Sequence, residues 1–165
     1  GLESGQGIII LSALSIVSFF TGNSWITVIS LIMVASLFAF LFFNHYPAKV
    51  FPGDSLTYSI GALIAIISIL GNFEKIALFF FIPYILETLL KLRGGLNKYS
   101  FGKPTGNNSL DLKYSKIYSL NHLAILIYKK INIEPTERKV VALIWLFQIF
   151  IISLGFYIFR GGIFQ

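Results

Sequence analysis

The residues best suited to chemistry lie in a short polar stretch, residues 44–55, between two apolar runs. This stretch places an Asn, a His, a Lys and an Asp beside the aromatic residue Phe51. Mg²⁺ is commonly held by one or two carboxylates together with substrate phosphates, which makes Asp54 a candidate metal ligand. Gly53, just before it, would let a ligand approach the backbone closely. An Asp in front of an apolar run is also the usual N-cap of a helix, so both interpretations of Asp54 remain open.

The elements that must position this stretch are membrane helices. Of the 165 residues, 56% are hydrophobic and only 12% are charged, whereas a soluble domain is nearer 45–50% apolar and about 25% charged. We therefore predict an all-α, polytopic membrane protein. The absence of cysteine excludes disulfides, zinc ribbons and iron–sulfur sites. The net charge of +6 fits basic loops at a membrane face, so no nucleic-acid partner is expected.

Five apolar runs predict five spans, since a helix needs about 20 mainly apolar residues to cross the bilayer. The expected spans lie near residues 7–21, 25–43, 55–71, 75–91 and 139–159. Two longer connections, 44–54 and 92–138, separate them. Within the second, residues 105–108 resemble a hairpin turn, because the residues beyond them alternate between polar and apolar.

The distribution of charge predicts the orientation. Of the 13 lysines and arginines, 11 lie in these two connections or at their edges. By the positive-inside rule, both connections are expected to be cytoplasmic, and five spans then leave the C-terminus outside.

The stretch 44–55 also resembles a known signature. Its pattern Asn44-X-X-Pro47-Ala48-X-X-Phe51-X-Gly53-Asp54-Ser55 is similar to that of the polyprenyl-phosphate N-acetylhexosamine-1-phosphate transferases. The opening residues 1–6 are similar to a motif of the dolichyl-phosphate N-acetylglucosamine-1-phosphate transferase branch. Two further local matches follow in family order, at residues 81–84 and 110–116.

This resemblance implies a reaction and a domain organisation. It implies transfer of N-acetylglucosamine 1-phosphate from UDP-GlcNAc to dolichyl or polyprenyl phosphate, with release of UMP and with Mg²⁺ or Mn²⁺ as cofactor. Residues 1–165 would be the C-terminal half of a longer membrane transferase. The Asp-Asp pair and the Asn residues that complete the active site would lie upstream. Membrane lipid is an expected partner, and a homodimer is one option.

Carried over position by position, the resemblance implies roles for the residues of this stretch. Asp54 would bind the metal and act in catalysis, Phe51 would stack on uracil, and Gly53 and Asn44 would contribute to substrate binding. The alternatives are packing for Phe51 and bracing of the loop for Asn44. His45 is a weaker candidate for proton transfer.

The second connection departs from the family pattern. Family members carry a His- or Arg-rich element there that contacts the pyrophosphate and sugar, whereas residues 99–104 hold neither His nor Arg. Lys103, and next Lys98, would have to replace it, although a lysine is a point charge without the bidentate fork of arginine. The alternative for each lysine is contact with anionic lipid. Glu87 could either bind substrate or brace its helix.

Two functions of other classes remain open. One is a non-catalytic membrane subunit or degenerate half-protein of the same fold. The other is a transporter subunit, because Pro83 and Glu87 inside an apolar run would suit a substrate path.

Overall fold

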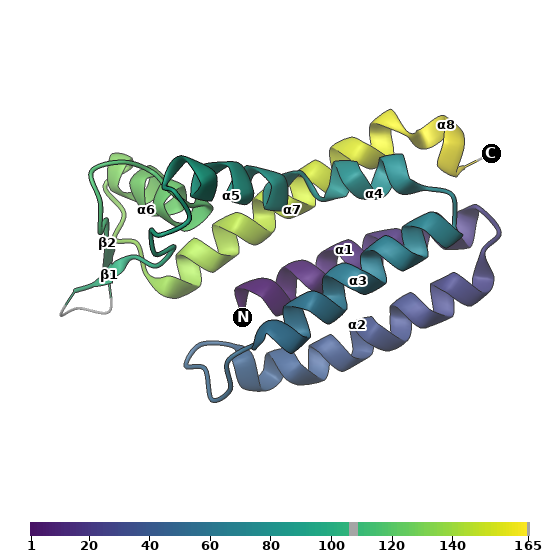
Figure 1. Ribbon diagram of the computed structural model, residues 1–165, viewed down its shortest axis with the longest axis horizontal. Coiled ribbons are helices and arrows are strands. Elements are labelled where there is room, and N and C mark those ends of the chain that lie inside the picture. Colours follow the sequence, from purple (N-terminus) through teal and green to yellow (C-terminus); the bar gives the residue numbers. More distant parts are fainter. Residues whose placement is uncertain (106–108, 165) are drawn as a thin grey trace. The chain divides into compact units, whose positions relative to one another are not determined.

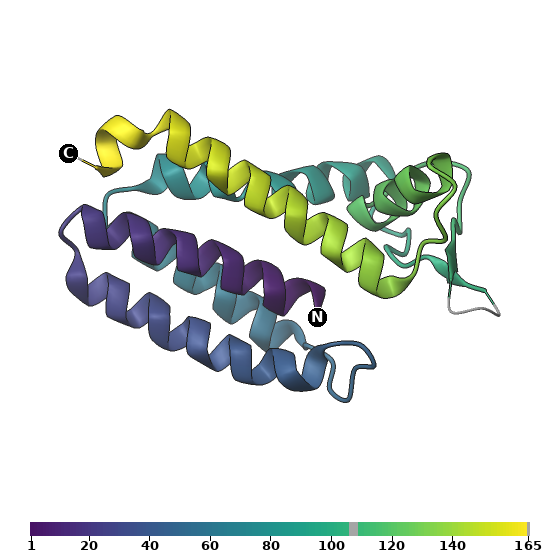
Figure 2. The same cartoon turned by 180° about the vertical axis from the view of Figure 1, so that it is seen from behind.

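The computed structural model describes residues 1–105 and 109–164, which are mostly helical, as predicted (Figures 1 and 2). The chain divides into two compact units. Unit 1 comprises Gly1–Phe81 and the C-terminal segment from Gln148, and unit 2 comprises Ile82–Phe147. The long helix α7, Glu137–Ile158, contributes its first half to unit 2 and its second half to unit 1.

Unit 1 contains the helices α1 (Leu2–Phe20), α2 (Ser24–Asn44), α3 (Asp54–Leu70), α4 (Glu74–Phe80) and α8 (Arg160–Ile163). The first three lie side by side in both views (Figures 1 and 2). Short turns join α1 to α2 and α3 to α4, and the side chain of Asn23 in the first turn donates to the Gly71 carbonyl in the second (3.4 Å).

Helix α1 is the central helix of unit 1. A Cβ atom at Gly7 would lie 3.1 Å from Ile60 of α3 and 3.2 Å from Leu37 of α2, so a larger residue here would push these side chains away by a few tenths of an ångström. Small residues commonly permit such close packing between membrane helices. In keeping with this position, 67% of the residues in an 18-residue apolar segment of α1 are buried, against 28% in the corresponding segments of α2 and α7.

Three of the described helices, α1, α2 and α7, are long and apolar enough to cross a membrane. They correspond to the first, second and fifth predicted spans. Helix α3 is a shorter apolar helix of 17 residues, which is at the lower end of the usual range of about 17–25. The structure therefore supports a membrane protein, while the number of five spans stays a prediction.

The fourth predicted span is not one continuous helix. Helix α4 ends at Phe80, and α5 (Ile82–Arg93) begins after a break at Phe81. Pro83 fits the break, because it has no N–H to donate to a carbonyl of the preceding turn, whereas proline is tolerated in the first turn of a helix, which is its position in α5.

Unit 2 contains α5, the strands β1 (Lys103–Pro104) and β2 (Leu110–Asp111), the helix α6 (Leu120–Lys130) and the first half of α7. The two strands pair antiparallel, with Lys103 opposite Asp111. They flank the predicted hairpin turn, of which residues 106–108 lie outside the described part of the chain. Strand β2 is joined to the segment before α7, since Leu110 N donates to the Pro135 carbonyl (2.7 Å).

Candidate active-site loop

The loop between α2 and α3, residues 45–53, is folded back onto the end of α2. The Phe43 carbonyl accepts hydrogen bonds from the backbone N–H groups of Lys49 (2.9 Å) and Val50 (3.3 Å). The peptide bond between Tyr46 and Pro47 is cis. The Phe43 carbonyl is one of the last four of α2, which have no donor within the helix, and it is satisfied here by the loop.

Asn44 joins this loop to the start of the chain. Its side chain is buried; Nδ2 donates to the Val50 carbonyl (2.8 Å), and Oδ1 accepts from the hydroxyl of Ser4 (2.9 Å). The Gly1 nitrogen donates to the Asn44 carbonyl (3.0 Å). Asn44 therefore braces the loop, while its role in substrate binding stays a prediction. Sequence reasoning did not identify Ser4, because no local pattern marks a contact between residues 40 positions apart.

Asp54 is the first residue of α3 and not its N-cap. Gly53 occupies the N-cap position, with extended backbone angles (φ −94°, ψ 177°) and a carbonyl that accepts from Leu56 N (3.0 Å). Asp54 instead lies in the first turn, where its charge favours the positive end of the helix dipole. Its side chain is exposed, and no hydrogen bond or ion pair to the carboxylate occurs within the described residues. The N-cap alternative is therefore not supported.

Gly53 is not required by the fold of unit 1. Its φ is negative, and a Cβ atom there would meet nothing closer than the Ser55 hydroxyl at 3.8 Å. The space around this Cβ position is therefore open.

Phe51 is presented to the outside of the loop. Its side chain is 80% exposed, so it contributes little to the packing of the described residues. Lys49 and His45, from the same loop, are also exposed. Exposed aromatic and cationic groups therefore lie on one braced loop, and the exposed Asp54 follows directly at the start of α3.

The residues present suit a magnesium or manganese ion only in part. No group of three or more His, Asp or Glu side chains within residues 1–105 and 109–164 could hold a metal. One exposed carboxylate, that of Asp54, matches the way Mg²⁺ binds to one or two carboxylates and completes its shell with phosphates and water. The loop can thus supply one ligand of such a site.

Lys103, the other predicted substrate contact, belongs to unit 2. It is exposed and lies opposite Asp111 in the small sheet. An ion pair with Lys129 holds the pKa of Asp111 below its ordinary value of 3.8; the Leu112 N–H contributes, and the charge of Lys103 adds a smaller effect in the same direction. Lys103 thus lies opposite Asp111, whose negative charge is already paired with Lys129.

Glu87 braces unit 2. Its carboxylate accepts from Leu120 N at the start of α6 (2.7 Å) and from the Ser100 hydroxyl (3.3 Å), and it forms an ion pair with Lys91 (3.7 Å). Of the two roles left open for Glu87, these contacts favour the bracing one.

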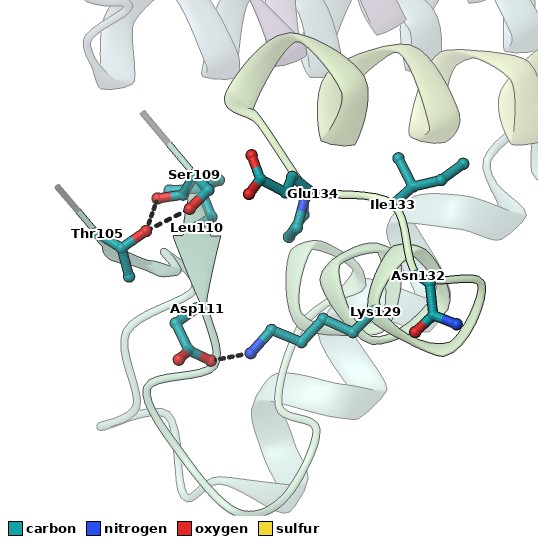
Figure 3. Close-up of a pocket in the computed structure, with 9 residues that line it drawn as sticks. Thr105, Ser109, Leu110, Asp111, Lys129, Asn132, Ile133 and Glu134 are labelled. Carbon is teal, nitrogen blue, oxygen red and sulfur yellow. Dashed lines mark hydrogen bonds and ion pairs between the residues drawn. The ribbon is translucent and has the colours of Figure 1, made fainter. Parts of the chain in front are cut away.

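A pocket of about 300 Å³ lies in unit 2 between β2, α6 and the segment before α7. Figure 3 shows Asp111 and Lys129 pointing toward each other at this pocket. An anion bound here would have to compete with Asp111 for the lysine.

The sequence profile of glycosyl transferase family 4 matches residues 1–72, which include the whole candidate loop. Among curated proteins, one from Saccharolobus solfataricus is 40% identical over 147 residues, and one from Sulfolobus acidocaldarius is 36% identical over 147 residues. Both carry the provisional name UDP-N-acetylglucosamine–dolichyl-phosphate N-acetylglucosaminephosphotransferase.

A phospho-N-acetylmuramoyl-pentapeptide-transferase from Staphylococcus carnosus is 39% identical over 89 residues, which is 54% of this chain and 28% of that protein. The two previous matches cover 88% of this chain but only 44% and 43% of the relatives, so the chain spans less than half of their length. On these matches, the chain belongs to glycosyl transferase family 4, the family of the polyprenyl-phosphate N-acetylhexosamine-1-phosphate transferases.

Proposed function

We propose that the protein to which this chain belongs transfers N-acetylglucosamine 1-phosphate from UDP-GlcNAc to dolichyl or a related polyprenyl phosphate. An oxygen of the lipid phosphate attacks the sugar-bearing phosphorus. The bond from that phosphorus to the bridging oxygen breaks, and UMP leaves with the electron pair. The product is a lipid-linked sugar pyrophosphate. The names of the relatives support this reaction class.

One observation carries the proposal: a braced loop presents Asp54 and Phe51 together, both exposed, within the part of the chain that matches the family. Phosphoryl transfer depends mainly on positioning and on neutralisation of charge. In the proposed roles, Phe51 stacks on the uracil ring, and the open backbone at Gly53 admits the pyrophosphate. Asn44 acts as a positioning residue by holding the loop through Val50.

Asp54 is proposed as one ligand of Mg²⁺ or Mn²⁺, and a bound ion would neutralise phosphate charge during the transfer. Lys103 is proposed as a further cation for the phosphates, although it has no bidentate geometry. The other ligands are proposed to come from residues outside this chain, because the described residues contribute one suitable carboxylate.

We further propose that both long connections face the cytoplasm. A cytoplasmic loop at the bilayer surface would let a soluble nucleotide sugar meet a lipid nucleophile. The basic residues concentrated in these connections support this orientation.

The variant Asp54→Asn in the full-length protein tests the proposal. Asn keeps the size of the side chain but removes the negative charge, so release of UMP from UDP-GlcNAc should fall to near background. Loss of the favourable interaction with the helix dipole costs only about 0.3–1 kcal/mol, and the protein should remain folded in a melting curve.

Glu74→Gln is the matched control, because Glu74 is also an exposed acid in the first turn of an apolar helix, α4. It should leave UMP release unchanged. Turnover like that of the wild type in Asp54→Asn would contradict the metal role. Absence of turnover in the wild-type protein itself would favour the non-catalytic subunit.

A further inference from the structure

Unit 2 carries a cluster of tyrosine and lysine side chains to which the proposed function assigns no role. We define the aromatic–lysine cluster as Lys98, Tyr99, Lys113 and Tyr114. The Lys113 Nζ atom lies 4.2 Å from the centre of the Tyr99 ring, and the Lys98 Nζ atom lies 5.2 Å from that of Tyr114. The hydroxyl of Tyr114 accepts from Tyr99 N (3.4 Å), which joins the two pairs.

Three of the four cluster residues face outward, and Tyr114 is half-buried. Both lysines are exposed, and the Tyr99 side chain is 63% exposed. Two apolar residues in the same stretch of chain are similarly exposed to the outside, Leu96 to 67% and Phe101 to 73%. Aromatic rings next to lysines, with apolar residues beside them, are typical of segments that lie at the head-group level of a bilayer.

The connections of the cluster place it near the point where a spanning helix begins. Strand β2 ends two residues before Lys113, and its Leu110 bonds to Pro135, while Ser109, just before the strand, forms an isolated bridge with Thr136. Helix α7, a candidate span, begins directly afterwards at Glu137. In Figures 1 and 2, β2 lies beside the start of α7.

The charge of this segment favours an anionic surface. Residues 94–118 contain four lysines, at positions 98, 103, 113 and 116, and a single acid, Asp111. The carboxylate of Asp111 is paired with Lys129 from α6. Lys98, Lys113 and Lys116 are exposed and form no ion pair within the described residues, so they are available to an external anionic partner.

We propose that the aromatic–lysine cluster docks on the anionic lipid head groups of the bilayer next to α7. Tyr99 and Phe101 enter the head-group layer, and Lys98 and Lys113 bind lipid phosphates. Tyr114 holds the cluster to unit 2 through ring contacts with Tyr118 and His122. This docking does not depend on the transferase reaction, and it would hold the aromatic–lysine cluster against the membrane face.

The test uses the full-length protein, with any cysteines outside this chain replaced and a nitroxide attached at Phe101→Cys. In phosphatidylcholine vesicles with about a third phosphatidylglycerol, the nitroxide should collide readily with oxygen and weakly with a water-soluble nickel complex. Lys98→Gln/Lys113→Gln should raise the nickel collision rate several-fold, because each lysine near an anionic surface contributes to the attraction. High salt or phosphatidylcholine alone should have the same effect.

Lys130→Gln is the matched control, since Lys130 is an exposed lysine of the same unit outside the cluster, and it should leave the nitroxide at the same depth. A nitroxide that is open to the nickel complex in anionic vesicles would overturn the proposal. The proposal would also be overturned if the depth of the nitroxide did not change with lipid charge or with the double substitution Lys98→Gln/Lys113→Gln. Protection from both oxygen and nickel would also overturn it, because it would mean that protein covers the cluster.

Discussion

The side-chain amide of Gln148 donates a hydrogen bond to the main-chain carbonyl of Phe80 (2.8 Å), at the point where α4 ends. The Gln148 side chain is fully buried, and its Oε1 atom accepts from Gln6 Nε2 of α1 (3.5 Å). The last four carbonyls of a helix have no donors within that helix. In an apolar core, a side-chain donor is a way to satisfy such a carbonyl, so Gln148 stabilises the break before Pro83.

Replacement of Gln148 by Met should therefore destabilise unit 1. Met keeps a similar volume but leaves the Phe80 carbonyl and the Gln6 amide without this partner, which should cost about 1–3 kcal/mol. A melting curve of the purified full-length protein should show a lower Tm. Ser153→Ala, an exposed position on the same helix, should not lower it. An unchanged Tm for Gln148→Met would mean that another donor reaches Phe80.

Glu87→Ala should loosen the start of α6. The Leu120 N–H would lose its carboxylate acceptor, so exchange of this amide with solvent should accelerate by about ten-fold or more, which corresponds to roughly 1.4 kcal/mol. Lys91→Ala is the control, because its ion pair with Glu87 is long and its side chain is 44% exposed. Equal effects of the two variants on the Leu120 amide would show that the ion pair, and not the hydrogen bond, braces α6.

Asp111 should titrate below 3.8, its ordinary pKa, because the Lys129 ammonium stabilises the charged form. A depressed pKa adds to stability above the unfolded value, and this contribution is lost as pH falls through the folded pKa. The contact between Lys129 and Asp111 should therefore weaken only in that acidic range. Carboxyl NMR of Lys129→Met should show a higher pKa for Asp111. Lys130→Met is the control, and the pKa of Asp111 in this variant should equal that in the wild type.

Phe51→Ala should weaken binding of UDP and UDP-GlcNAc by similar factors, because both carry uracil. Stacking on a base is worth about 1–3 kcal/mol, so the loss should be roughly 5- to 150-fold. The Tm should stay constant, since Phe51 is 80% exposed. Phe42→Ala is the control, an aromatic of α2 that is 81% exposed. Unchanged UDP affinity in Phe51→Ala would remove Phe51 from the nucleotide site.

Labelling of single cysteines should place positions 49 and 162 on opposite sides of the membrane. Lys49 is exposed in the first long connection, and a Cβ atom at Gly162 would meet no other atom within 4 Å, so a cysteine fits at either position. This chain contains no cysteine that could interfere. Reaction of both positions with an impermeant maleimide from the same side would contradict the arrangement of five spans.

The helical membrane class, the family and the stretch 44–55 could all be identified from sequence. Hydropathy is a sum over neighbouring residues, and the spacing of Asn44, Phe51 and Asp54 is visible along the chain. Pro83 indicates a kink in the fourth apolar run, but the division into two helices at Phe81 was not predicted, because the apolar run continues through it.

Only the tertiary structure decided which polar side-chain and backbone groups are hydrogen-bonded to one another. Asn44 bonds to Ser4, Gln148 to Phe80, and Glu87 to Leu120, over separations of 40, 68 and 33 residues. No local pattern encodes such pairs, because each depends on how separate helices pack against one another. The exposure of Asp54 and Phe51 was decided in the same way. It depends on how the loop folds back onto α2, which the types of its residues alone do not specify.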